Sequence, residues 1–150
     1  MKKYIIAGCI ALALSAVAHA ENWIMVMESD NNVRLLVDVD SFGAKNWPSS
    51  SDATKQIPWL FAKFMFYTSD GTGDPFLYTT KAESCNNGNG ELVLQGWDGK
   101  NFATKNRYWW SKDGHKMYDS GGLALCALLK SNASTEPTKQ KSAATGKNSV

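Results

Sequence analysis

Residues 58–69 read PWLFAKFMFYTS, the strongest strand signal in the chain. Aromatic and β-branched residues favour strands, and successive side chains of a strand point to opposite faces of its sheet. One face would carry Leu60, Ala62, Phe64 and Phe66, and the other would carry Trp59, Phe61, Lys63, Met65 and Tyr67. Both faces are apolar, so this segment is predicted to be a central strand that needs cover on each side.

Further strands are predicted on both sides of this segment, each bounded by turn-forming residues. They are residues 22–28, 33–39, 76–85, 91–97 and a last strand from Asn101 or Phe102 to Trp110. Asp98-Gly99 is the best two-residue hairpin signal in the chain. Residues 43–57 show no periodicity and many turn formers, so they are predicted to form a long surface loop of the kind that often carries recognition.

The segment 123–130 is rich in Ala and Leu and is predicted to form a short helix, with Ser120 as a candidate cap. Together these elements predict an α+β fold: an antiparallel β-sheet of about six strands with a short C-terminal helix. One short helix covers only one face of the sheet. A homodimer contact, a strongly curled sheet or a bound partner would cover the other face, and a homodimer is the favoured interpretation.

Both ends of the chain are predicted to lie outside the folded domain. Lys2 and Lys3, an apolar stretch over 4–17 and Ala18-His19-Ala20 stand in the order of a cleavable signal peptide. The apolar stretch is shorter than the roughly 20 residues that span a bilayer, so no membrane span is expected. Residues 131–150 are polar, contain no aromatic residue and are predicted to be a disordered tail. The sequence thus divides into a signal peptide (1–20), one domain (21–130) and a tail.

Cys85 and Cys126 are the cysteines that remain once residues 1–20, including Cys9, are removed. Pairing is the default outcome in an oxidising compartment, so these two residues are predicted to form a disulfide that tethers the helix to the sheet. The remaining sequence has no Cys-x-x-Cys pair and a single histidine, His115. No metal site and no cofactor are predicted.

The charge balance argues against nucleic acid as a partner. The chain has 16 basic and 14 acidic residues, and removing Lys2 and Lys3 leaves 14 of each. Nucleic-acid binding normally needs a clustered basic face, and residues 21–130 show none.

Few residues suggest catalysis. Asp38 and Asp40 stand two apart on a predicted strand and would point to the same side, as an acid–base pair would. The simpler interpretation is that they end the strand and bind turn amides. His115 lies beside a Lys-Asp-Gly turn, and no Gly-x-Ser-x-Gly pattern is present. The protein is predicted not to be an enzyme, although a pocket joining these three residues would revive a hydrolase.

The six tryptophans are the better candidates for binding, because Trp is enriched in binding hot spots. Trp47 lies in the predicted loop, and the neighbours Trp109 and Trp110 must face opposite ways on a strand, so one of the two can be exposed. Lys105 and Arg107 precede this pair and could form a basic-aromatic patch with it. Core packing is the competing interpretation for each tryptophan except Trp47.

Several of these features together resemble the surface-adhesin protein E family. They are Trp23 soon after the cleavage site, the segment Val37-Asp38-Val39-Asp40-Ser41-Phe42, the strong strand over 58–69, Cys85 at the close of the next strand and Cys126 in a final helix. The resemblance extends over nearly all of residues 22–130. It implies an antiparallel sheet with a disulfide-tethered helix and no known catalytic role. The best-known member binds host matrix and plasma proteins and dimerises.

The sequence therefore predicts a noncatalytic exported protein of the envelope or cell surface that binds a protein partner, such as a host matrix or envelope protein. The alternative is a periplasmic module that binds glycans or inhibits an enzyme through exposed tryptophans. The signal peptide leaves periplasmic, secreted and surface locations open.

Overall fold

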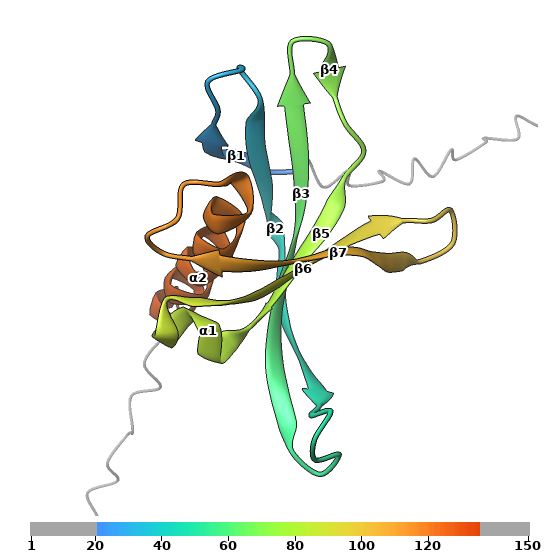
Figure 1. Cartoon of the computed structure of the whole chain (residues 1–150), viewed down its shortest axis with the longest axis vertical. Coiled ribbons are helices and arrows are strands. Elements are labelled where there is room, and N and C mark those ends of the chain that lie inside the picture. Colours follow the sequence, from blue (N-terminus) through green and yellow to red (C-terminus); the bar gives the residue numbers. More distant parts are fainter. Residues whose placement is uncertain (1–20, 136–150) are drawn as a thin grey trace, which may run out of the picture.

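The computed structural model describes residues 21–135; the predicted signal peptide over 1–20 and the tail over 136–150 lie outside the described residues (Figure 1). Its strands are β1 (Trp23–Glu28), β2 (Arg34–Pro48), β3 (Gln56–Thr68), β4 (Gly71–Thr72), β5 (Phe76–Lys81), β6 (Asn89–Trp97) and β7 (Phe102–Ser111). All pair antiparallel in the order β1-β2-β3-β5-β6-β7, and the short β4 pairs with β3. The helices are α1 (Ala82–Asn87) and α2 (Met117–Thr135). The predicted α+β fold is confirmed.

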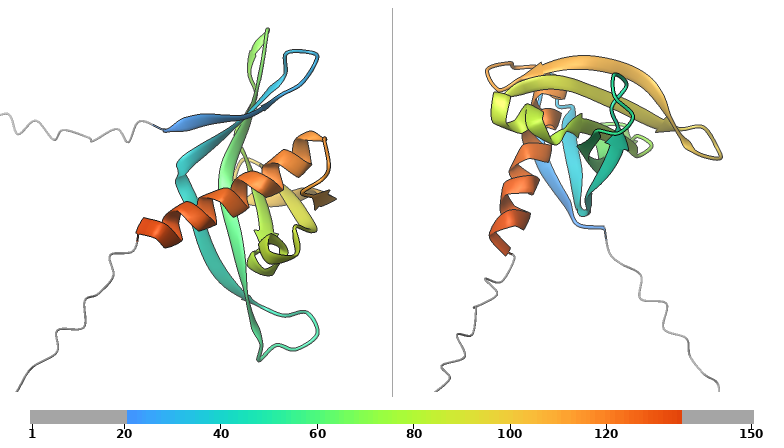
Figure 2. Two further views of the ribbon diagram at one scale, coloured as in Figure 1. Left: turned by 90° about the vertical axis from the view of Figure 1, so that its left-hand side faces the viewer. Right: turned by 90° about the horizontal axis from the view of Figure 1, so that it is seen from below.

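Helix α2 lies across one face of the sheet and contacts strands from β1 to β7 (Figure 2). As the alternation predicts, Leu60, Ala62 and Phe64 are all buried on one side of β3. The core beneath the helix is completed by Leu35, Val37, Phe76, Tyr78, Leu92, Trp110 and Leu125. Glycines let the helix come close, since a Cβ at Gly121 would lie 2.7 Å from the Tyr78 ring.

The predicted disulfide joins Cys85 to Cys126, with their Cα atoms 5.3 Å apart. The prediction that a strand runs over 76–85 is wrong at its end, because β5 stops at Lys81 and Cys85 lies in α1. The short helix α1 is capped by Gly88, whose φ of 69° is the left-handed conformation that glycine adopts without strain. The disulfide therefore ties one helix to the other.

The predicted loop over 43–57 is also wrong. Strand β2 runs to Pro48 and β3 begins at Gln56, so most of this segment is a paired hairpin in which Trp47 lies opposite Ile57. The Trp47 and Trp59 rings pack edge to face, with centroids 5.8 Å apart. This cross-strand contact stabilises pairing in a segment whose composition is typical of a loop.

The C-terminal helix is longer than predicted at both ends. It begins at Met117 and continues to Thr135, so residues 131–135 belong to α2 rather than to a disordered tail. Near its end, the Ser131 hydroxyl donates to the Leu128 carbonyl and the Ser134 hydroxyl donates to the Lys130 carbonyl, both at 3.0 Å. These bonds give both hydroxyl groups a partner on the preceding turn of the helix.

Candidate functional site

The face of the sheet that points away from α2 is hollowed between the far end of the β2–β3 hairpin and strands β6 and β7. Two adjoining hollows of about 520 and 490 Å³ share Lys81, Glu91 and Arg107 in their linings. Thr79 and Val93 are buried on this face although α2 lies on the other one, so they form a floor. We call this surface the tryptophan groove; its walls carry Trp47, Trp59, Lys81, Glu91, Arg107 and Trp109.

Register in the sheet brings these residues together. Trp59 pairs with Lys81 across β3 and β5, and Glu91 pairs with Trp109 across β6 and β7. Because side chains alternate along a strand, paired residues share a face. Thr80, one residue before Lys81, points the other way and accepts a hydrogen bond from the Trp110 indole in the core.

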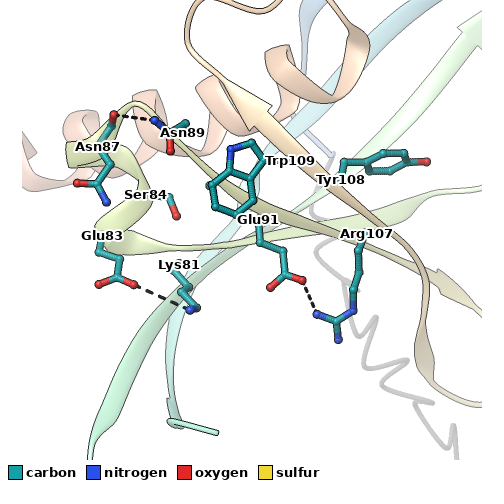
Figure 3. Close-up of a pocket in the computed structure, with 10 residues that line it drawn as sticks. Lys81, Glu83, Ser84, Asn87, Asn89, Glu91, Arg107, Tyr108 and Trp109 are labelled. Atoms are coloured by element: carbon teal, nitrogen blue, oxygen red, sulfur yellow. Dashed lines mark hydrogen bonds and ion pairs between the residues drawn. The ribbon is translucent and has the colours of Figure 1, made fainter. Parts of the chain in front are cut away.

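Opposite charges line the centre of the groove. The Arg107 guanidinium donates to the Glu91 carboxylate at 2.6 Å, and the Lys81 ammonium lies 4.0 Å from the Glu83 carboxylate (Figure 3). The Arg107–Glu91 pair is open to solvent on the arginine side, where such a pair contributes only about 0–1 kcal/mol to folding. The paired charges are therefore free to exchange partners with a ligand at small cost to the fold.

Aromatic rings flank these charges. The Trp109 side chain is 69 % exposed and stands over Glu91 (Figure 3). On the other side of the groove, the Lys81 ammonium lies 5.9 Å from the Trp59 ring centroid, and Trp59 meets Trp47 at an interplanar angle of 65°. The groove thus offers one open indole and one edge-to-face indole pair, not a flat row of rings.

Three of the predicted binding residues meet in the groove: Trp47, Arg107 and Trp109. Trp47 reaches it from β2, not from a loop. Trp110 does not contribute, because it is 1 % exposed and belongs to the core. Lys105 lines neither hollow, since its aliphatic chain lies across Gly96, nearer the end of the β6–β7 hairpin.

Trp59, Lys81 and Glu91 were not predicted as site residues. The alternation along 58–69 already placed Trp59 on the face opposite the buried one, and this signal was sufficient to identify it. No pattern marks Lys81 or Glu91, because their roles depend on which strands become neighbours.

The carboxylates considered for catalysis have structural roles or stand apart. Asp38 is buried and accepts hydrogen bonds from the backbone N–H groups of Asn22 and Asp40 at 3.2 and 3.3 Å. The Lys63 ammonium lies 3.5 Å from Asp38 and also donates to Glu21 at 2.9 Å, and the bond to Glu21 raises the pKa of Lys63 above its ordinary value. Asp40 and His115 are exposed, and no hydrogen bond or ion pair among residues 21–135 joins His115 to either aspartate.

Within the described part of the chain, no group of three or more His, Cys, Asp and Glu side chains is placed to hold a metal ion. No helix of residues 21–135 has the length and apolar character needed to cross a membrane. No known family model, curated protein or solved structure matches the chain.

Proposed function

We propose that this chain is a noncatalytic exported binding protein of the cell envelope or surface, and that a protein partner occupies the tryptophan groove. The observation that carries the proposal is the exposed Trp109 indole beside the Arg107–Glu91 pair at 2.6 Å. Trp and Arg dominate binding hot spots, where an aromatic anchor and a charged group are desolvated together. A groove that combines both on a rigid sheet suits this mode of recognition.

The ring geometry favours a protein over a glycan. Trp47 and Trp59 meet edge to face at 65°, so their faces do not form one platform for successive sugar rings. The charged centre of the groove, with Lys81 and Arg107 near Glu91, matches the mixed charges of a protein surface. The exposed Trp109 alone favours the alternative of a glycan-binding module.

A noncatalytic role is supported by the contacts of Asp38. Its carboxylate is buried and contacts two backbone N–H groups and Lys63. These contacts are typical of a residue that holds neighbouring segments of backbone together. Export is supported by the Cys85–Cys126 disulfide, a bond that persists in oxidising compartments, and by the signal-peptide pattern over 1–20. The resemblance to the surface-adhesin protein E family points the same way.

We also propose that the protein is a homodimer and that the edge strand β1 takes part in the contact. Ile24 and Met25 are 50 % and 54 % exposed, and the segment WIMVM that contains them is uncharged. Exposed apolar edge strands promote pairing, whereas the opposite edge, β7, carries Lys105 and Arg107, which oppose it. Light scattering of the chain from Glu21 to Val150 should give twice the single-chain mass. The Met25→Lys variant should give the mass of a single chain. A monomer for the unsubstituted chain would contradict this part of the proposal.

The binding proposal is tested with the same chain, immobilised and exposed to purified matrix and envelope proteins and to a panel of glycans. At least one protein should bind, and Arg107→Ala with Trp109→Ala should weaken its binding about 30-fold or more, the loss typical of hot-spot residues. Leu123→Ala is the matched control, because it removes an exposed apolar side chain on α2, on the other face of the sheet. Protein binding that ignores Arg107 and Trp109 would contradict the proposal, and glycan binding that needs Trp109 would establish the alternative.

A further inference from the structure

Strand β7 is an edge of the sheet, and it pairs with β6 alone among the described strands. Asn106, Arg107 and Trp109 are exposed along it. The register with β6 is interrupted at Lys105, an extra residue on β7, so the regular part of this edge begins at Asn106 and continues to Ser111. An unpaired edge presents backbone N–H and C=O groups to any strand that reaches it.

Two hydrogen bonds show which backbone groups of β7 point outward. The Lys112 N–H donates at 2.7 Å to the carbonyl of the residue before β6, and thus points to the β6 side. The Ser111 N–H donates instead to the Asp119 carboxylate, at 2.8 Å on the outer side. In an antiparallel pair, only every second residue directs its N–H and C=O groups to the neighbouring strand. The residues two and four positions before Ser111 therefore point outward as well.

These two residues are Trp109 and Arg107, and their backbone groups have no partner on the outer side. Within the described residues, no hydrogen bond beyond the β6–β7 ladder involves the backbone of either one. Their side chains line the tryptophan groove (Figure 3). A strand added to this edge would thus bond to the backbone of the same residues whose side chains form one wall of the groove.

The charge of this edge favours an acidic strand over a second copy of β7. Residues 99–112 contain no acidic residue and four basic ones: Lys100, Lys105, Arg107 and Lys112. Two acidic residues offset part of this charge, since Glu91 pairs with Arg107 from the inner side and Asp98 interacts with Lys105. Four cations against two carboxylates leave the edge positive. It would repel the same edge of another copy and attract acidic side chains.

We propose that the partner of the tryptophan groove adds an extended, acidic segment of its own chain to β7 as an antiparallel strand. The inference rests on the proposed function, since it states how that partner is held. Antiparallel pairing places one partner residue opposite Trp109 and another, two residues later, opposite Arg107. Both side chains lie on the groove face, because paired residues share a face. The segment should therefore carry an apolar residue and then an acidic residue, in the order apolar-x-acidic.

The pair of Arg107 with Glu91 is compatible with this acidic residue. The Arg107 side chain is 61 % exposed, and a guanidinium has several N–H donors, so it can bind a second carboxylate from the outer side. Trp109 offers an exposed ring to the apolar residue. In recognition by strand addition, the main-chain bonds supply affinity and the alternate side chains supply specificity.

The first experiment selects short random peptides, displayed on phage, against the immobilised chain from Glu21 to Val150. The selected peptides should share the order apolar-x-acidic and should bind the Arg107→Glu variant about tenfold less. Replacing the acidic residue of the peptide by lysine should restore binding to that variant, which also shows that the variant is folded. Arg34→Glu is the matched control, because it reverses another arginine paired with a glutamate, at 2.9 Å, outside the groove. It should bind the peptides as the unsubstituted chain does.

Methylation of the peptide amides tests the strand pairing itself. In an added strand, the apolar and acidic residues direct their N–H groups to β7, and the residues between and after them direct theirs away. N-methylation of the first two should weaken binding about tenfold or more, because it removes both donors. N-methylation of the other two should change binding by no more than about twofold.

Equal losses from the two methylations would overturn strand addition. So would selected peptides that lack the apolar-x-acidic order, or a selection that yields no binding peptide. Peptides that need Arg107 and Trp109 but tolerate both methylations would overturn the strand and leave the groove as the binding site. The proposed function fails by a different result, namely that no matrix or envelope protein binds the chain through these two residues.

Discussion

The Trp110 indole N–H donates a hydrogen bond to the Thr80 hydroxyl, 3.1 Å away, in the interior between the sheet and α2. Thr80 in turn donates to the Glu91 carbonyl at 2.7 Å. This chain of bonds links β7, β5 and β6 through side chains, beneath the strands whose opposite faces form the tryptophan groove. The Trp110 and Thr80 side chains are buried, whereas the neighbouring Trp109 is 69 % exposed.

Trp110→Ala is therefore expected to lower the free energy of unfolding by about 3–5 kcal/mol, because it leaves a large cavity. Trp110→Phe should cost less, about 1–2 kcal/mol, since it removes the N–H donor but keeps most of the ring. Urea denaturation followed by circular dichroism measures both changes. Trp109→Ala serves as the control and should change the free energy by no more than about 0.5 kcal/mol. Equal losses at positions 109 and 110 would contradict the described orientation of β7.

Gly122→Ala is expected to lower stability by about 1–2 kcal/mol, although alanine is the better helix former. A Cβ at Gly122 would overlap the Trp110 indole and push α2 away from the sheet. Thermal unfolding of this variant should be compared with that of Asn132→Ala, at an exposed position of the same helix. Asn132→Ala should be neutral or stabilising, and a stabilising Gly122→Ala would show that the helix is not seated on Trp110.

Asp119→Ala is expected to cost about 2–3 kcal/mol, because two backbone N–H groups would lose a charged acceptor. The buried Asp119 carboxylate accepts from the N–H groups of Ser111 and Lys116 at 2.8 and 2.9 Å, and so connects the end of β7 to the start of α2. Asp119→Asn keeps one acceptor oxygen and should lower the free energy of unfolding by less than Asp119→Ala does. Chemical denaturation with Asp113→Ala as the exposed control decides the matter: similar losses for the two alanine variants would argue against this role.

Replacing both cysteines by alanine is expected to lower the free energy of unfolding by about 4 kcal/mol. The bond joins residues separated by 41 positions, and closing so long a loop removes much conformational freedom from the unfolded chain. The measurement is urea denaturation of the double variant beside the oxidised parent. A difference below about 1 kcal/mol would mean that the unfolded chain is already constrained, for example by residual contacts between the segments around Cys85 and Cys126.

The sequence predicted those elements of the fold that have strong local signals. The alternation along 58–69 correctly placed Leu60, Ala62 and Phe64 in the core, and the two cysteines of the domain correctly indicated the disulfide. The hairpin over 43–57 was not predictable, because Trp47 and Trp59 stabilise it only once β2 and β3 are paired. Helix α1 has only six residues, too few to show a helical period.

The candidate site was only partly predictable, for a related reason. The rule that Trp109 and Trp110 face opposite ways is local, and it holds, but it does not say which of the two is exposed. That choice depends on α2, since Gly122 gives the helix room to cover Trp110. Lys81 and Glu91 enter the groove through strand neighbours that the sequence does not specify.

The bond between Cys85 and Cys126 closes a covalent ring that contains β6, the turn after it and β7. A protease that cuts once within this ring, for instance at the exposed Gly99, leaves two pieces that remain linked through sulfur. The mass of the nicked protein exceeds that of the intact one only by the water added in the cleavage, until a reductant separates the pieces. The segments before and after the cut thus stay on one molecule, and a single cleavage in the β6–β7 hairpin does not divide it.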